Sequence, residues 1–512
     1  MLPLTSIVFA LAATWAFGSH AELPPQEPAD QGTVAPLTGV AKLQASVVEH
    51  TLDNGWTFLI VPREGAPVAS FHTYIDVGGI FEDEGATGMA HMFEHMAFKG
   101  SARLGSLDWT AEQQAMNKLE RAYTRLRSLR EAGKTGAVSK AEQTFLVAQK
   151  KAASFVDPEA FSKILEEAGG SGSLNASTSA EETRYVVSLP SNQVELWCWM
   201  ERERFHKPVL REFYKERDAV MEERRMRVES DPFGKLFEEL LATAFTTHPY
   251  RRPVIGYEAD LNSFSRTDAQ VFYAKHYGVR RFTTAIIGDV DPATLIPMLE
   301  RYFGDLEPGP EPTEINVTEP EQEAERRIDV AFPAMPIVIA AWHVPSRSHP
   351  DSVALNLGLS ILGQASASRL GEALVRGSSL AAGAGAEAGL PGDRYPNLAI
   401  AYGIPAQDTP IEVLEAGIYE VMDTFTQDGP TASELAGAKN RARASLLRGL
   451  QDNEALAADL CEWQSKSGDW RNLFAQPDAL AQVTAKDIQR VFAKYFTQAS
   501  RTVATLVPAK SE

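Results

Sequence analysis

Two histidines and a glutamate lie close together in a pattern that can bind and use a metal ion. Residues 87–96 read TGMAHMFEHM, so His91 and His95 are four residues apart and Glu94 comes just before the second histidine. On a helix, residues four apart lie one turn apart on the same face, so both imidazoles can reach one ion. Glu94 is then close enough to act on a water molecule at the metal. The run therefore predicts a metal site with a carboxylate base.

This spacing is uncommon. With ten histidines in 512 residues, chance placement gives the pattern on the order of 0.02 times in such a chain. The order His-x-x-Glu-His is the inverted form of the zinc-peptidase helix motif. The alternative is a pair of core or surface histidines that happen to lie beside a surface glutamate.

A catalytic zinc ion takes three protein ligands and leaves one position open for water. The best candidates for the third ligand lie in residues 215–224, where Glu216 and Glu223 are seven apart. Seven residues are two helical turns, so both carboxylates share a face. One of them can bind the ion while the other orients a ligand. By itself this segment is more typical of a solvated helix with mixed charges, and only the histidine motif makes it a candidate for the metal site.

The motif lies among predicted strands and helices. Apolar runs at 47–52 and 56–61 flank Asp53-Asn54-Gly55, and Asn-Gly between two such runs predicts a β-hairpin. Further elements are predicted as a strand at 68–77, helices within 87–167 and 191–245, a strand at 282–289 and a helix at 291–303. Residues 45–304 are thus expected to form one domain that contains the site.

The composition changes between residues 305 and 329, which contain four prolines, nine acids and two bases. Proline and like charges both extend a chain, so this segment is expected to be a semi-rigid linker. Beyond it, over 330–512, we predict strands at 337–343, 379–388, 397–404 and 502–507, a helix at 352–362 and several long helices. The predicted fold class is α+β, with two tandem, similar α/β-roll domains whose mixed, mostly antiparallel sheets carry helices on one face.

The chain is acidic, with 68 Asp and Glu against 49 Lys and Arg and a net charge of -19. This balance disfavours a binder of phosphate backbones, so we expect no nucleic acid partner. The 305–329 segment holds seven of the net negative charges, so the total does not by itself indicate an acidic binding surface. Two cysteines, Cys198 and Cys461, are too few for a disulfide scaffold. We expect both to be buried, and a single bridge between them stays open.

Residues 1–21 contain no charged side chain, and the apolar run 4–17 leads into Ser19-His20-Ala21. Small residues at these positions are typical of a signal-peptide cleavage site, with a buried N-terminal helix as the alternative. We expect export to a periplasm or secretion, with a flexible segment at 22–44 in the mature protein. No other segment reaches about 18 uninterrupted apolar residues, so no transmembrane segment is predicted.

Several further runs accompany the metal motif, and together they resemble the insulinase/pitrilysin zinc metallopeptidase family, in particular its mitochondrial processing peptidase-like branch of two-domain subunits. The resemblance is carried by LDNG at 52–55, GATGMAHMFEHMAFKG at 85–100, NAST at 175–178, Thr183-x-Tyr185, ERDAVMEE at 216–223, HPY at 248–250, Gly256 and GDVDP at 288–292. It covers about residues 45–305. The second half matches more loosely, through Ser368-Arg369-Leu370 and its order of strands and helices.

The resemblance implies a specific site. By this resemblance, the chain would hold one Zn²⁺ with the ligands His91, His95 and Glu223. Glu94 would be the general base, and Glu216 would support the site as a second acid. A strand at Asn175 and Ala176 would bind the backbone of a peptide substrate as an added strand. The resemblance also implies a dimer, either with a second copy or with a related subunit, that encloses a chamber.

Two features depart from that pattern. Between His95 and Glu223 lie 127 residues, and the excess maps to 107–167, where 107–130 and 139–155 predict a helical hairpin. The second half lacks a His-x-x-Glu-His run. We therefore expect a zinc-dependent endopeptidase with one metal site. The alternative is a non-catalytic or conditionally active subunit of a peptidase heterodimer.

Overall fold

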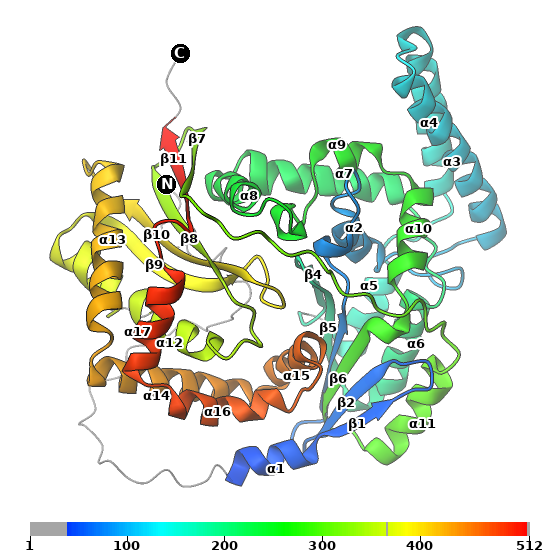
Figure 1. Cartoon of the computed structure of the whole chain (residues 1–512). Coiled ribbons are helices and arrows are strands. Elements are labelled where there is room, and N and C mark those ends of the chain that lie inside the picture. Colours follow the sequence, from blue (N-terminus) through cyan, green and yellow to red (C-terminus); the bar gives the residue numbers. More distant parts are fainter. Residues whose placement is uncertain (1–37, 171, 365–366, 509–512) are drawn as a thin grey trace. The chain divides into compact units, whose positions relative to one another are not determined.

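The computed structural model describes residues 38–170, 172–364 and 367–508 (Figure 1). From Leu43 onward the chain forms one compact unit, and this unit contains both sheets. The leader predicted at 1–21 lies outside the described residues. Among the residues that are described, no helix is both long and apolar enough to cross a membrane.

The first half contains the predicted strands and helices in the predicted order, together with a strand at Thr183–Pro190 and helices at Glu258–Ser263 and Arg266–His276 that were not predicted. The elements are β1 (Val48–Thr51), β2 (Thr57–Pro62), β3 (Val68–Ile75), β4 (Asn175–Thr178), β5 (Thr183–Pro190) and β6 (Phe282–Gly288), with α1 (Thr38–Ser46), α2 (Met89–Met96), α3 (Trp109–Glu131), α4 (Thr135–Ala153), α5 (Ala160–Leu165), α6 (Val194–Phe205), α7 (Phe213–Arg224), α8 (Pro232–Ala244), α9 (Glu258–Ser263), α10 (Arg266–His276) and α11 (Pro292–Phe303).

The second half repeats this alternation with fewer helices. Its elements are β7 (Arg326–Phe332), β8 (Ile337–Val344), β9 (Ala381–Leu390), β10 (Asn397–Pro405) and β11 (Arg501–Pro508), with α12 (Ser352–Gly363), α13 (Ile411–Asp428), α14 (Ala432–Gly449), α15 (Asn453–Ser467), α16 (Asn472–Gln482) and α17 (Ala485–Tyr495).

The two sheets share one topology. The first has the strand order β1-β2-β6-β3-β5-β4 and the second β7-β11-β8-β10-β9. Only β2 with β6, and β11 with β7, run parallel, while all other neighbouring strands are antiparallel. If β1 is left aside, the strands correspond one to one, and β9 takes the place that β4 has in the first sheet. The predicted α+β class with two similar domains is therefore confirmed.

Each half covers one face of its own sheet with helices. In the first half Phe71 of β3 stacks on Trp197 of α6, with ring centroids 4.4 Å apart, and Trp56 lies 4.6 Å from Phe303 of α11. In the second half α12, α13 and α17 cover the sheet. This is the one-sided packing that the sequence predicts.

The opposite face of each sheet is covered by a helix from the other half. Helix α15 lies on β3 and β6, where the thiol of Cys461 donates to the carbonyl oxygen of His72 at 3.5 Å. Helix α8 lies on the second sheet, and its Leu236 and Leu240 are buried together with Ile339 and Leu506. Each large apolar side chain buried in this way contributes about 1.5–3 kcal/mol. The exchanged helices therefore hold the two halves together, which the sequence patterns did not indicate.

The helical hairpin predicted between 107 and 167 is present as α3 and α4. Asp108 caps α3 by accepting from the backbone N–H of Ala111. The turn between the helices places Gly133 at φ +64°, a conformation that glycine adopts without strain. Helix α4 begins at Thr135, earlier than the predicted residue 139. Its N-terminal Thr-Gly pair has low helix propensity and masks the start in the sequence.

Three local features differ from the sequence predictions or complete them. Residues 38–46 form α1 where a flexible segment was expected, because its apolar residues show no strong helical periodicity. Strand β7 begins at Arg326 inside the predicted linker, since the alternation of Ile328 and Val330 is hidden among charges. Cys198 and Cys461 are both buried and free, so the open question of a bridge is answered in this structure.

Candidate metal centre

Helix α2 carries the motif and is held at its N-terminus by backbone contacts. Gly88 precedes the helix at φ +93°, and a Cβ at this position would lie 2.7 Å from the carbonyl oxygen of Ile255. Only glycine fits both the conformation and the contact. The buried carboxylate of Glu82 accepts from the N–H groups of Gly88 and Ala90 at 2.9 and 2.8 Å. These bonds satisfy N–H groups that a helix start leaves free and fix the direction of α2.

His91, His95 and Glu223 bring their donor atoms together between α2 and α7. Oε2 of Glu223 lies 3.6 Å from Nε2 of His91 and 3.4 Å from Nε2 of His95, and one ligand atom from each residue falls within 4.8 Å of the other two. Zinc binds histidine and carboxylate at about 2.0–2.2 Å, so the edges of its tetrahedron are about 3.3–3.6 Å long. Both carboxylate–imidazole distances match such an edge, and the donor set fits zinc.

The protein sets the charge of the two histidines differently. Burial lowers the pKa of His91 to about 4, so this imidazole is neutral and can donate its lone pair. Against the opposing effect of burial, Glu216 and Glu223 raise the pKa of His95 to about 9. The hydrogen bond from His95 lowers the pKa of Glu223 in turn, so this carboxylate stays anionic. Without metal, the site therefore holds a proton on His95 at neutral pH.

Glu216 lies behind the His95 ring and is not one of the three residues that bring their donor atoms together. Its Oε2 is 3.7 Å from Nδ1 of His95, and its Oε1 is 2.6 Å from Nζ of Lys99. Lys99 also contacts Glu212 at 3.4 Å. Although burial opposes it, His95 and Lys99 lower the pKa of Glu216 to about 2. Glu216 thus orients the ring of His95 through the nitrogen that does not face Glu223, while Lys99 fixes Glu216.

The side chain of Glu94 reaches the end of β4. The hydroxyl of Thr178, the last residue of β4, donates to Oε2 of Glu94 at 2.6 Å. Burial raises the pKa of Glu94, and the bond from Thr178 opposes this shift. The carboxylate is therefore fixed in direction and made more basic than an exposed glutamate, which suits a proton acceptor.

Strand β4 forms the outer edge of the first sheet, with β5 as its neighbour. Asn175 is exposed and Ala176 is half-buried. The backbone N–H of Ala176 donates to Oδ1 of the Asn175 side chain at 2.9 Å. The edge next to Glu94 is therefore available to an extended chain once the Asn175 side chain turns away.

The structure brings all the predicted site residues into one region, on α2, α7 and β4. It also adds residues that sequence reasoning missed, namely Glu82, Lys99, Thr178 and Arg227, whose guanidinium lies 3.0 Å from Oε1 of Glu223. One signal was available for Thr178. It follows Ala176 by two residues and therefore shares its side of the strand.

Zinc affinity is expected to depend steeply on pH. His95, with its pKa near 9, must lose its proton to bind metal, whereas His91 is already neutral above about pH 4. Between pH 8 and pH 6 the zinc dissociation constant should therefore rise roughly tenfold for each unit of pH decrease. Titration against a chromophoric chelator at several pH values measures this slope, and about one proton should be released for each zinc bound at pH 7. A flat profile would contradict the assignment of a protonated His95.

Two family models match the chain. The one described as Insulinase (Peptidase family M16) matches residues 58–128 and 148–258, and the one described as Peptidase M16 inactive domain matches residues 263–442. The first match spans α2, β4 and α7. Its gap at 129–147 covers the end of α3, the turn and the first part of α4, so the tip of the hairpin lies outside the family pattern.

Individual proteins resemble the chain over most of its length. The zinc protease PqqE of Helicobacter pylori is 25% identical over 466 residues, which are 90% of this chain and 92% of that protein. A probable mitochondrial-processing peptidase subunit beta of Arabidopsis thaliana is 25% identical over 477 residues, which are 90% of this chain and 78% of that protein. The crystal structure of a protease from Helicobacter pylori superposes with a TM-score of 0.75 and 23% identity, covering 90% of this chain and 99% of that one.

Proposed function

The chain belongs to the insulinase family of peptidases, family M16, and on this premise we propose that it is a zinc-dependent endopeptidase. The observation that carries the proposal is the juxtaposition of three donor atoms with the geometry of a zinc site and a carboxylate, Glu94, held beside them by Thr178. The ligands are His91, His95 and Glu223, with one Zn²⁺ per chain.

The chain's own residues then perform proton transfer and positioning. Zinc, when bound, supplies Lewis acidity that polarises a carbonyl group and lowers the pKa of water toward about 7. Glu94 accepts the proton of the attacking water and passes it to the amine that leaves. Thr178 keeps Oε2 of Glu94 in place during both transfers. Glu216 holds the His95 ring in the orientation that the ion requires.

The substrate is a peptide or an unfolded segment, bound in extended form along β4. An added strand gains main-chain hydrogen bonds at the sheet edge and needs no particular side-chain sequence for them. In the structure the N–H of Ala176 donates to the Asn175 side chain. A carbonyl oxygen of the incoming strand takes the place of that side-chain oxygen. The scissile bond then lies on the side of β4 that faces Glu94.

Removal of the metal tests this function. Treatment with a zinc chelator, followed by dialysis, should reduce cleavage of a mixed peptide library by at least about 10³-fold, since nothing then polarises the carbonyl. Adding one equivalent of zinc should restore it, and Mg²⁺, which prefers oxygen ligands, should not. Full cleavage by a preparation shown to be free of metal would overturn the proposal.

A second function has support from the comparisons. Residues 263–442, which include the first part of the second half, match a model described as an inactive domain, and one relative is named as a subunit of a processing peptidase. As the alternative, we propose a non-catalytic or conditionally active subunit that pairs with a related protein, whereas the active endopeptidase of the first proposal pairs with a second copy of itself. Activity of the purified chain, with its mass in solution measured by light scattering, separates the two. Zinc binding without hydrolysis until a related subunit is added would favour the second.

We also propose that the protein is exported, with cleavage after residue 21. The support is the uncharged, apolar run that ends in small residues. Sequencing of the mature N-terminus from a fractionated cell decides this point, and a chain that retains residues 1–21 in the cytosol would contradict it.

A further inference from the structure

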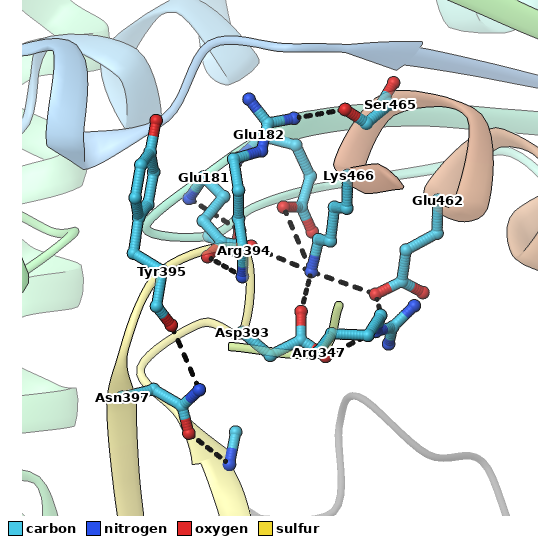
Figure 2. Close-up of polar contacts among 12 residues, drawn as sticks. Glu181, Glu182, Arg347, Asp393, Arg394, Tyr395, Asn397, Glu462, Ser465 and Lys466 are labelled. Atoms are coloured by element: carbon cyan, nitrogen blue, oxygen red, sulfur yellow. Dashed lines mark hydrogen bonds and ion pairs between the residues drawn. The ribbon is translucent and has the colours of Figure 1, made fainter. Parts of the chain in front are cut away.

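A buried group of charges joins the second half to the strand that holds the catalytic base. We name it the Lys466 cluster, and it comprises Lys466, Glu181, Glu182, Asp393 and Glu462. Nζ of Lys466 lies 2.8 Å from Glu181, 2.8 Å from Asp393, 2.9 Å from Glu462 and 4.0 Å from Glu182. Figure 2 shows the ammonium at the centre of these carboxylates. Its side chain is only 6% exposed.

Every carboxylate of the cluster lies within 4.0 Å of the Lys466 ammonium, so the cluster is an ion-paired contact between the two halves. Although burial opposes it, the surrounding carboxylates raise the pKa of Lys466 well above its ordinary value, and the ammonium stays charged. Arg347 contacts Asp393 at 2.6 Å and Glu462 at 2.9 Å. Buried carboxylates are costly unless they are paired in this way, and loss of the central ammonium leaves Glu181 without its ion-pair partner.

The residues of the Lys466 cluster come from both halves of the chain. Glu181 and Glu182 belong to the turn between β4 and β5 in the first half. Lys466 and Glu462 lie on α15, and Asp393 lies in the loop between β9 and β10. Arg394 of the same loop donates its backbone N–H to Glu181 at 2.8 Å and contacts Asp76, at the end of β3, at 2.6 Å.

The turn that bears the two glutamates directly follows Thr178. It is closed by a bond from the N–H of Ser179 to the carbonyl oxygen of Glu182 at 2.8 Å. Gly78 packs against it so closely that a Cβ there would lie 2.6 Å from the backbone nitrogen of Glu182. The turn is therefore closely packed against Gly78, and it continues directly into β4, whose last hydroxyl contacts Glu94.

We propose that Lys466 is a positioning residue for hydrolysis, which acts through the 179–182 turn and Thr178 to hold Glu94 in its working direction. The proposal rests on the proposed peptidase function. It gives the second half, which has no metal motif, a defined part in the reaction. Lys466 touches neither the metal ligands nor Glu94, so it acts on rate through geometry alone.

The test compares Lys466→Met with a matched control, Arg63→Met. Arg63 also joins the two halves, with bonds to Gln451 and Asn453 at 2.8 and 2.7 Å, but it does not contact the turn. Lys466→Met should lower kcat by about 10–100-fold, because a small misplacement of a catalytic group has an effect of this size. Bound zinc should be unchanged, and Arg63→Met should keep wild-type kcat.

A double-mutant cycle with Thr178→Val separates positioning from a general loss of stability. Thr178→Val alone should lower kcat by about 10-fold, through loss of the bond to Glu94. If Lys466 acts through Thr178, the double variant should lose little more than Lys466→Met alone. If the two effects multiply, the sites act independently and the proposal is overturned. Should Lys466→Met fail to fold, Lys466→Met with Glu181→Gln removes one charge of each sign and carries the same test.

Hydrogen exchange gives a readout that does not depend on activity. Amides of residues 175–183 should exchange faster in Lys466→Met than in the wild type or in Arg63→Met. Equal exchange in all three proteins would overturn the positioning role even if kcat falls. A wild-type chain that binds zinc yet cleaves no peptide would defeat the proposed function instead, and the exchange experiment would still decide whether Lys466 holds the turn.

Discussion

Glu94→Gln is expected to abolish peptide hydrolysis while the protein keeps its zinc. The loss should be at least about 10³-fold in kcat, within the 10²–10⁴-fold range that a general base contributes. An amide has nearly the same shape as the carboxylate, and its oxygen can still accept the hydroxyl of Thr178. It cannot take a proton from water. The donor atoms of His91, His95 and Glu223 are untouched, so metal content should equal that of the wild type.

Glu84→Gln is the matched control for this change. Glu84 lies in the exposed loop before α2, and its substitution removes one carboxylate from the same region without touching Glu94. It should cleave a mixed peptide library at the wild-type rate. If Glu94→Gln with full zinc cleaved as fast as Glu84→Gln, another group would have to serve as the base. If Glu94→Gln lost its zinc, the separation between ligands and base would be wrong.

The motif on α2 could be predicted because its geometry is local. Residues 91 and 95 lie on one helical turn whatever the rest of the chain does, so only the presence of the helix had to be right. The hairpin at Asn54-Gly55 is similar, since Gly55 takes φ +92° in a turn that closes between neighbouring strands. The β1–β2 hairpin of the first sheet therefore follows from short-range signals.

Glu223 could be reached only in part from the residues themselves. Helical spacing puts Glu216 and Glu223 on one face of α7, but it does not say which carboxylate meets the histidines. That choice depends on how α7 crosses α2, which is fixed by contacts between segments far apart in the chain. The family resemblance pointed to Glu223, and the distances of 3.4 and 3.6 Å place its Oε2 beside both imidazoles.

Lys466 and the Glu181-Glu182 turn could not be predicted for a different reason. Residues 462–467, EWQSKS, look like a solvated helix end, and Glu181-Glu182 look like an exposed turn. Both are buried only because α15 of the second half covers the first sheet. Strand β6 shows the same effect, since all seven of its residues are buried although single-sided packing would leave alternate residues exposed. Exchange of helices between halves leaves no short-range signal.

Glu223→Gln is expected to have the second large effect, a loss of zinc affinity of more than about 100-fold. Outer-shell partners of a metal site typically cost 10–100-fold when they are removed, and a residue that supplies a donor atom should exceed this range. Glutamine is neutral and a weaker donor than a carboxylate. The dissociation constant is measured by competition with a chelator at a fixed pH, because protonation of His95 competes with metal.

Two neighbours on the same helix calibrate that result. Glu222 is 60% exposed and pairs only with Arg225, so Glu222→Gln should leave zinc affinity unchanged. Glu216→Gln should lower zinc affinity by about 10–100-fold, which is between the effects of the other two substitutions, since Glu216 acts through the His95 ring. If Glu216→Gln lowered zinc affinity more than Glu223→Gln does, Glu216 would be the metal ligand and Glu223 would be the supporting acid. The Glu216 carboxylate would then have to give up Lys99 at 2.6 Å and cross to the other side of His95, which is why we expect Glu223 to hold the metal.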